Sequence, residues 1–171
     1  MDEKKDLPVR KHVRLENYDY SAKGAYFVTV CIKDRKEILS HICRGDPCGR
    51  PQTQLTQLGE IARGAIDYIE GLYGVDVDTY VIMPDHIHMI IVLCGERSTA
   101  RVAPTLGRAI GAYKSYISNE WRKICDADKM RTGDIWQRGY YEHIIRNGED
   151  LYEIRKYVED NPARRYLREK R

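Results

Sequence analysis

With 171 residues, 42% of them hydrophobic and 32% charged, the chain has the size and balance of one globular domain, so we expect residues 1–171 to form a single domain. No apolar run approaches the ~18 residues of a membrane span and no apolar segment follows the charged N-terminus, which argues against membrane contact and a secretory signal. The net charge is only +3, and the five cysteines form no C-x-x-C pair, which favours a reducing cytoplasm over a disulfide framework or a cysteine zinc site.

The first predicted element is a strand over residues 24–32, where aromatic and β-branched residues are frequent. Residues 43–53 contain two glycines and two prolines, which predicts an irregular loop. Apolar residues at helical spacing predict a helix over residues 55–72. Residues 75–83 and 86–93 are then predicted to be the two strands of a hairpin, joined by a turn that contains Pro and Asp.

A second amphipathic helix is predicted over residues 106–124. Residues 135–146 are expected to begin as a loop and become a strand near Tyr140. A last helix is predicted over residues 149–161, with Pro162 disfavouring its continuation. The order of these elements predicts an α+β, ferredoxin-like βαββαβ fold, in which a four-stranded antiparallel sheet carries two helices on one face and a further helix follows at the C-terminus. Such a fold does not identify the chemistry.

A pair of histidines, His86 and His88, lies at the start of the predicted strand 86–93. Side chains alternate between the faces of a strand, so both imidazoles point the same way. Two imidazoles side by side suit a divalent metal, although a third ligand must come from elsewhere in the fold. The alternative is that two unrelated histidines share a strand. The apolar remainder of the strand favours the metal site, because buried imidazoles without partners cost free energy.

A candidate nucleophile, Tyr157, and a candidate ligand, Asn161, lie four residues apart on the last predicted helix and therefore share one helix face. A tyrosine phenol can attack a phosphodiester and form a covalent intermediate. The amide oxygen of Asn161 suits a hard cation such as Mg²⁺ or Mn²⁺, and with the two histidines it would make an open three-ligand site that polarises the scissile phosphate. The chain has 13 tyrosines, so composition alone does not select Tyr157.

Basic residues cluster near both ends of the chain. Arg10, Lys11 and Arg14 lie in the N-terminal arm, and Arg164, Arg165 and Arg168 come after the end of the last predicted helix. Such clusters are candidate contacts to the phosphates of nucleic acid. The alternative, for each tail taken alone, is an ordinary solvated terminus.

Four segments resemble a known family, the single-tyrosine transposases that carry an HUH motif of two histidines around a hydrophobic residue. Residues 80–93, YVIMPDHIHMIIVL, resemble the paired strands of that motif. Residues 135–147 and 154–164 resemble the C-terminal blocks of the same family, which includes the IS200/IS605-type enzymes. Residues 14–35 look like the N-terminus of REP-associated tyrosine transposases. The resemblance covers nearly the whole chain except residues 43–53, and its motifs are specific jointly rather than singly.

The resemblance implies a role for each candidate residue. His86 and His88 match the HUH metal ligands. Tyr157 matches the nucleophile, and Asn161 matches the third ligand, where insertion-sequence relatives often carry Gln. The family's reaction implies Mg²⁺- or Mn²⁺-dependent cleavage of single-stranded DNA, which leaves a 5′-phosphotyrosine link and a free 3′-hydroxyl.

The resemblance also implies a partner. The family's substrates are hairpin-forming single strands, so we expect hairpin or palindromic DNA, with repetitive extragenic palindromes as the candidate target. A covalent phosphotyrosine keeps the energy of the phosphodiester bond, so the hydroxyl of another strand can displace the tyrosine without ATP. Insertion-sequence members work as dimers and REP-associated members can be monomeric, which leaves monomer and homodimer open for this chain.

Three other functions stay open at this stage. The first is a non-catalytic nucleic-acid-binding module, in which Tyr26 or Phe27 stacks on bases from the face of the sheet. The second is a metal-dependent phosphodiesterase that uses water rather than tyrosine. The third is a domesticated transposase relative that only binds DNA.

Overall fold

A computed structural model of the protein describes Asp19 and residues 21–44, 50–73, 75–94, 105–127 and 134–170. The predicted DNA-binding residues Arg10, Lys11 and Arg14 lie outside the described residues. The described part of the chain forms six strands, three α-helices and one 3₁₀ turn. They are β1 (Gly24–Cys31), η1 (Lys33–Arg35), β2 (Ser40–Arg44), β3 (Pro51–Leu55), α1 (Gln57–Tyr73), β4 (Val75–Ile82), β5 (His86–Leu93), α2 (Leu106–Ala127), β6 (Tyr141–Ile145) and α3 (Gly148–Glu169).

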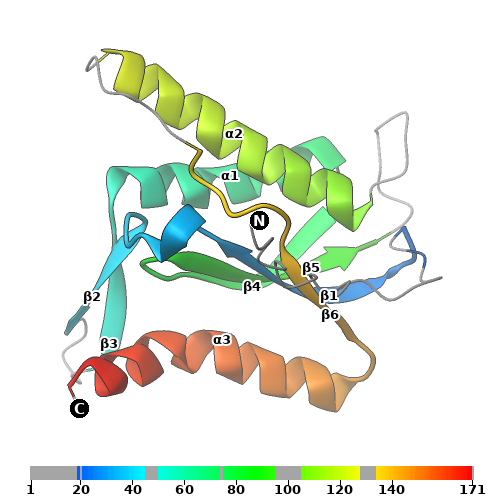
Figure 1. The fold of residues 1–171 in the computed structure, drawn as a ribbon. Helices are drawn as coiled ribbons and strands as arrows, with labels where there is room; N and C mark the ends of the chain where they lie inside the picture. Colours follow the sequence, from blue (N-terminus) through cyan, green and yellow to red (C-terminus); the bar gives the residue numbers. More distant parts are fainter. Residues whose placement is uncertain are drawn as a thin grey trace, which may run out of the picture.

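Four of the strands form one sheet in the order β4-β5-β1-β6, and every neighbouring pair is antiparallel. Helices α1 and α2 pack together against one face of this sheet, and α3 lies across the opposite face (Figure 1). If the hairpin β2–β3 is set aside, the chain order is βαββαβ followed by a helix. The ferredoxin-like prediction is therefore confirmed, and the predicted strands and first two helices are found within a few residues of their expected bounds.

The hydrophobic core lies between the sheet and the two helices α1 and α2. Alternate residues of β1 and β5, such as Val28 and Met89, point into it and are fully buried. Tyr113 of α2 is also fully buried, and its hydroxyl donates to the carbonyl oxygen of Ala62 on α1 at 2.9 Å. Because strand residues alternate, the residues between these core positions point to the other face, toward α3. His88 is one of them.

The prediction of an irregular loop over residues 43–53 is wrong at both ends. Ser40–Arg44 and Pro51–Leu55 are strands that pair antiparallel as a separate two-stranded sheet. Pro51 stands at the first position of its strand, where a missing backbone N–H costs little. The hairpin is anchored at its base, because the backbone N–H of Leu39 donates to the carbonyl oxygen of Pro84, in the β4–β5 turn, at 3.0 Å. This long-range anchoring has no local signature in the sequence.

The prediction that the last helix stops near Asn161 is also wrong. Helix α3 runs from Gly148 to Glu169 and contains Pro162, which is buried. Proline removes one intrahelical hydrogen bond, but it does not forbid a helix when tertiary contacts hold the turns that follow. Here the Arg44 guanidinium donates to the hydroxyl of Tyr166 at 2.9 Å, which attaches the last turns of α3 to the β2–β3 hairpin.

Three cysteines of the described residues are free thiols: Cys31, Cys43 and Cys125. Burial raises the pKa of the Cys31 thiol, which the nearby Arg35 offsets only in part.

None of the helices that the structure describes is both long and apolar enough to cross a membrane.

Candidate active site

A cavity of about 470 Å³ opens between the sheet and α3, on the face of the sheet away from α1 and α2. It brings together residues from β1, the β4–β5 turn, β5 and the C-terminal half of α3, most of them titratable or polar. The lining residues are Thr29, Arg35, Asp85, His86, His88, Tyr157, Asn161, Arg164, Arg165, Arg168 and Glu169. All seven candidate residues that lie in the described part of the chain therefore line one cavity.

The histidine pair is held with its Nε2 atoms facing each other at 3.1 Å. The Nδ1 atom of His86 lies 2.7 Å from an oxygen of Asp85. The Nδ1 atom of His88 lies 2.8 Å from the hydroxyl of Thr29, the residue paired with it across β1 and β5. Each imidazole is thus bonded on its far side, which leaves both Nε2 atoms directed to the space between the rings.

The electrostatics keep these groups in the forms that bind cations. Burial, with the nearby His86 and Arg35, lowers the pKa of the His88 imidazole to about 3, so it is neutral at physiological pH. Burial alone would raise the pKa of Asp85, but the hydrogen bond with His86 and the charges of Arg35 and Arg165 bring it below its ordinary value. An ionised Asp85 only accepts hydrogen bonds, so His86 donates to it from Nδ1.

Tyr157 lies beside the histidines from the facing helix. Its ring is 5.4 Å from the His88 ring and 5.9 Å from the Phe27 ring, centroid to centroid, with an edge-on arrangement to both. The guanidinium of Arg164 lies over the same ring, 5.4 Å from its centroid. Tyr157 remains 36% exposed and lines the cavity, so a substrate that enters the cavity meets this residue.

Asn161 lies one turn after Tyr157 and lines the same cavity, as the i, i+4 spacing predicts. It is only 8% exposed. Among the residues that the structure describes, none forms a hydrogen bond with its side chain. The side-chain amide is therefore available to a ligand that enters the cavity.

The donor set fits a divalent metal of the Mg²⁺ or Mn²⁺ type. Two ligands at right angles and about 2.1 Å from one ion would lie about 3.0 Å apart, close to the 3.1 Å between the two Nε2 atoms. Within the described ranges, no cluster of three or more His, Cys, Asp or Glu side chains could hold a metal. The amide oxygen of Asn161 is a neutral oxygen donor that lines the same cavity as the two histidines.

Two of the predicted basic residues of α3 have different surroundings. The Arg164 side chain is about half exposed and its nearest carboxylate oxygen, on Asp160, is 4.0 Å away. Arg165 is mostly buried and contacts three carboxylates, those of Glu37, Asp85 and Glu169. Their predicted role in DNA binding stays a prediction, and Arg164 is the one with a guanidinium open to a phosphate.

Four residues of the cavity were not predicted as site residues: Thr29, Arg35, Asp85 and Glu169. Asp85 was assigned only to a turn, although its place directly before His86 was a usable signal. Glu169 lies in the part of α3 that follows Pro162, where the helix was not predicted to continue. Thr29 and Arg35 are brought in by strand pairing and a distant turn, for which no local signal exists.

An open aromatic face, which the binding-module alternative needs, is not found at the two residues proposed for it. Tyr26 is fully buried on the core side of the sheet. Phe27 points toward α3, where its ring lies 5.2 Å from the His88 ring and packs on Tyr157. Neither ring is free to stack on a base.

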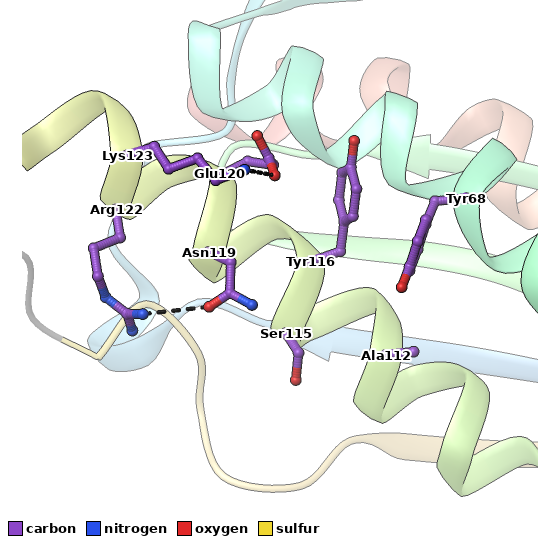
Figure 2. Close-up of a pocket in the computed structure, with 8 residues that line it drawn as sticks. All are labelled: Tyr68, Ala112, Ser115, Tyr116, Asn119, Glu120, Arg122 and Lys123. Atoms are coloured by element: carbon purple, nitrogen blue, oxygen red, sulfur yellow. Dashed lines mark hydrogen bonds and ion pairs between the residues drawn. The ribbon is translucent and has the colours of Figure 1, made fainter. Parts of the chain in front are cut away.

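A separate hollow lies on the other side of the molecule, between α1 and α2 (Figure 2). The stacked pair Tyr68 and Tyr116 lines it, with ring centroids 4.5 Å apart. Lys123 pairs with Glu120 there, and Arg122 bonds to Asn119. Without a nucleophile beside a base or a paired imidazole, this hollow offers less chemistry than the cavity under α3.

The antiparallel ferredoxin-like sheet, the paired histidines on its central strand and the tyrosine on the facing helix define a class of protein, the HUH single-tyrosine transposases. The sequence model of one family in that class, described as "Transposase IS200 like", matches residues 21–161. The chain belongs to this family, and the resemblance noted from its motifs is confirmed.

Relatives and solved structures agree with this assignment. An uncharacterised protein of Haemophilus influenzae is 30% identical over 169 residues, which cover 90% of this chain and 88% of that protein. A REP-associated tyrosine transposase of Escherichia coli is 24% identical over 147 residues, which cover 85% and 70%. The structure of a REP-associated tyrosine transposase bound to a REP hairpin matches with a TM-score of 0.61 and 21% identity, covering 89% of this chain and 74% of that one, which confirms the fold.

Proposed function

We propose that this protein is a metal-dependent endonuclease and strand transferase that acts on hairpin or palindromic single-stranded DNA through a 5′-phosphotyrosine intermediate. The observation that carries the proposal is the meeting of Tyr157, Asn161, His86 and His88 around one cavity, from two elements about 70 residues apart in the chain. Membership of a transposase family supports the reaction class.

In the proposed reaction, the Tyr157 hydroxyl oxygen attacks the phosphorus of one phosphodiester bond. The bond from phosphorus to the 3′ oxygen breaks, so the phosphate at the 5′ end becomes esterified to tyrosine. The phenol proton passes to water, and the departing 3′ oxygen takes up a proton. The hydroxyl of another strand can later attack the phosphotyrosine, which releases Tyr157 and joins the two strands.

His86, His88 and Asn161 would hold the divalent cation. Mg²⁺ or Mn²⁺ bound there would polarise the scissile phosphate and offset the charge that develops on it. Thr29 and Asp85 orient the imidazoles through their Nδ1 atoms, as outer partners of metal-binding histidines generally do.

Arg164 and Arg168 are proposed to contact the phosphates on either side of the cleaved bond. They lie four residues apart on α3, and both line the cavity beside Tyr157. A solved relative is bound to a REP hairpin, which supports repetitive extragenic palindromes as the substrate class here. A chromosomal DNA substrate fits a cytoplasmic location.

The test is a covalent-trapping assay. The protein is incubated with end-labelled hairpin single-stranded DNA and Mg²⁺ or Mn²⁺, denatured, and separated by electrophoresis. We expect a labelled adduct that disappears in Tyr157→Phe. The matched control is Tyr152→Phe, because Tyr152 lies on the same helix, is 62% exposed and does not line the cavity.

Two outcomes would contradict the proposal. Cleavage that persists in Tyr157→Phe without an adduct would identify a phosphodiesterase that uses water. Hairpin binding without cleavage by the wild-type protein, under any divalent metal, would identify a DNA-binding relative.

A further inference from the structure

Arg165 and Asp85 connect helix α3 directly to one of the paired histidines. We propose that these two residues form a positioning pair, which holds His86 in the orientation that binds metal only while α3 is docked. The inference rests on the proposed function, and it assigns to Arg165 the assembly of the site rather than contact with DNA.

The Arg165 guanidinium is surrounded by acceptors. Its Nη1 atom donates to an Asp85 oxygen at 2.8 Å and its Nε atom donates to a Glu169 oxygen at 2.7 Å. Its Nη2 atom contacts Glu37. The side chain is 22% exposed and that of Asp85 is 11% exposed. A guanidinium fork held by three carboxylates from three parts of the chain has one available orientation.

One oxygen of Asp85 serves both partners. Oδ1 accepts from Arg165 at 2.8 Å and from Nδ1 of His86 at 2.7 Å. The hydrogen bond to Nδ1 keeps the proton on that nitrogen, so Nε2 of His86 carries a lone pair toward His88. Arg165 holds the oxygen that faces His86, while Arg35 lies 3.2 Å from the other oxygen of Asp85. The carboxylate so held selects both the ring orientation and the tautomer of His86.

Arg165 also lies on the face of α3 that carries the other proposed site residues. Tyr157, Asn161 and Arg165 follow at intervals of four residues, so they lie along one face of α3. All three line the cavity. The contact of Arg165 with Asp85 therefore links the face of α3 that carries the proposed nucleophile and third ligand directly to the partner of His86.

A simpler role for Arg165 would be to anchor the helix. The chain contains a matched case, because Arg155 of α3 donates to Asp78 of β4 from Nε at 2.8 Å and contacts it again through Nη2. That pair also joins α3 to the sheet, but it touches neither histidine. Arg155→Gln thus removes an anchor of the same kind and leaves the surroundings of His86 intact.

An effect of the Arg165 charge and an effect of its positioning role would change the metal affinity in opposite directions. Removing the positive charge of Arg165 beside the cavity reduces repulsion of a cation, so an effect of charge alone would tighten metal binding. Loss of positioning would weaken it, because outer partners of metal-binding histidines typically account for about 10- to 100-fold in affinity.

The experiment titrates the full-length protein with Mn²⁺ by calorimetry without DNA. It also records by ¹⁵N NMR which nitrogen of His86 is protonated in the metal-free protein. For Arg165→Gln we expect about 10-fold weaker Mn²⁺ binding and a shift of His86 toward the Nε2–H tautomer. For Arg155→Gln we expect Mn²⁺ affinity and tautomer like the wild type, even if both variants lose thermal stability equally. Arg165→Lys keeps the charge and one contact, so its Mn²⁺ affinity should lie between those of the wild type and Arg165→Gln.

Unchanged or tighter Mn²⁺ binding in a folded Arg165→Gln, or an equal loss in Arg155→Gln, would overturn the inference. If Arg165→Gln does not fold, Arg165→Lys decides by the same criteria. The NMR measurement needs no metal, so an unaltered His86 tautomer counts against the inference by itself. Failure of the proposed function would look different: no DNA adduct would depend on Tyr157, while the Mn²⁺ and NMR effects of Arg165 persisted.

Discussion

The Nε2 atoms of His86 and His88 lie 3.1 Å apart and face each other, because each ring is bonded through Nδ1 to a fixed partner on its far side. Strand alternation puts the two imidazoles on one face, but alternation alone does not turn their nitrogens inward. Asp85 and Thr29 do so, and they leave both Nε2 atoms directed to the place where a cation would be bound.

The first prediction concerns His88. In His88→Ala we expect DNA cleavage to fall about 100-fold or more, because one metal ligand is lost, while hairpin binding in a gel-shift assay changes little. His143→Ala is the control, since this exposed imidazole pairs with Asp150 outside the cavity. Full cleavage by His88→Ala would refute the ligand assignment.

A second prediction separates stability from activity at Asn161. Alanine has a higher helix propensity than asparagine by roughly 0.5 kcal/mol, and the change removes an amide that lines the cavity and has no hydrogen bond to the described residues. Asn161→Ala should therefore match or exceed the Tm of the wild type while it binds Mn²⁺ more weakly and cleaves more slowly. A lowered Tm with normal Mn²⁺ affinity would show that the amide is structural.

A third prediction concerns phosphate contacts on α3. Each phosphate neutralised on a single strand contributes about −0.7 to the slope of log K against log salt. Arg164→Gln and Arg168→Gln should each weaken binding of every hairpin sequence and make this slope shallower by about that amount. Arg122→Gln on α2, where the guanidinium bonds to Asn119 away from the cavity, should leave the slope alone. Equal slopes in all variants would argue against the phosphate role.

A fourth prediction uses the anchor between α3 and β4. The hydrogen bond from Arg155 lowers the pKa of Asp78 below its ordinary value near 3.8, despite partial burial of the carboxyl. A carboxyl with a depressed folded-state pKa contributes stability above its unfolded pKa, and this contribution is lost as the pH falls through the folded pKa. Asp78→Asn should therefore lower the Tm at pH 7 by about 1–3 °C, and the difference from wild type should shrink below about pH 4. A pH-independent difference would exclude this ion pair as its source.

Much of the fold follows from periodicities that act over a few residues. Alternation along residues 24–32 and 86–93 and helical spacing in residues 55–72 and 106–124 place the sheet, both core helices and the shared face of the histidines. The spacing of Tyr157 and Asn161 likewise depends only on the pitch of a helix. These patterns can be recognised in the sequence because the residues of the buried face recur with the period of the strand or helix.

Other features depend on contacts between distant parts of the chain. Helix α3 continues past Pro162 because Arg165 and Tyr166 bind partners 80 and 122 residues away, and the energy of those contacts has no trace in the local pattern. The same holds for Asp85, which sequence reasoning left in a turn and which the docked helix joins to His86. Periodicity shows which face of an element is buried. The element that covers this face is set by the chain topology, so only the tertiary structure decides which residues meet there.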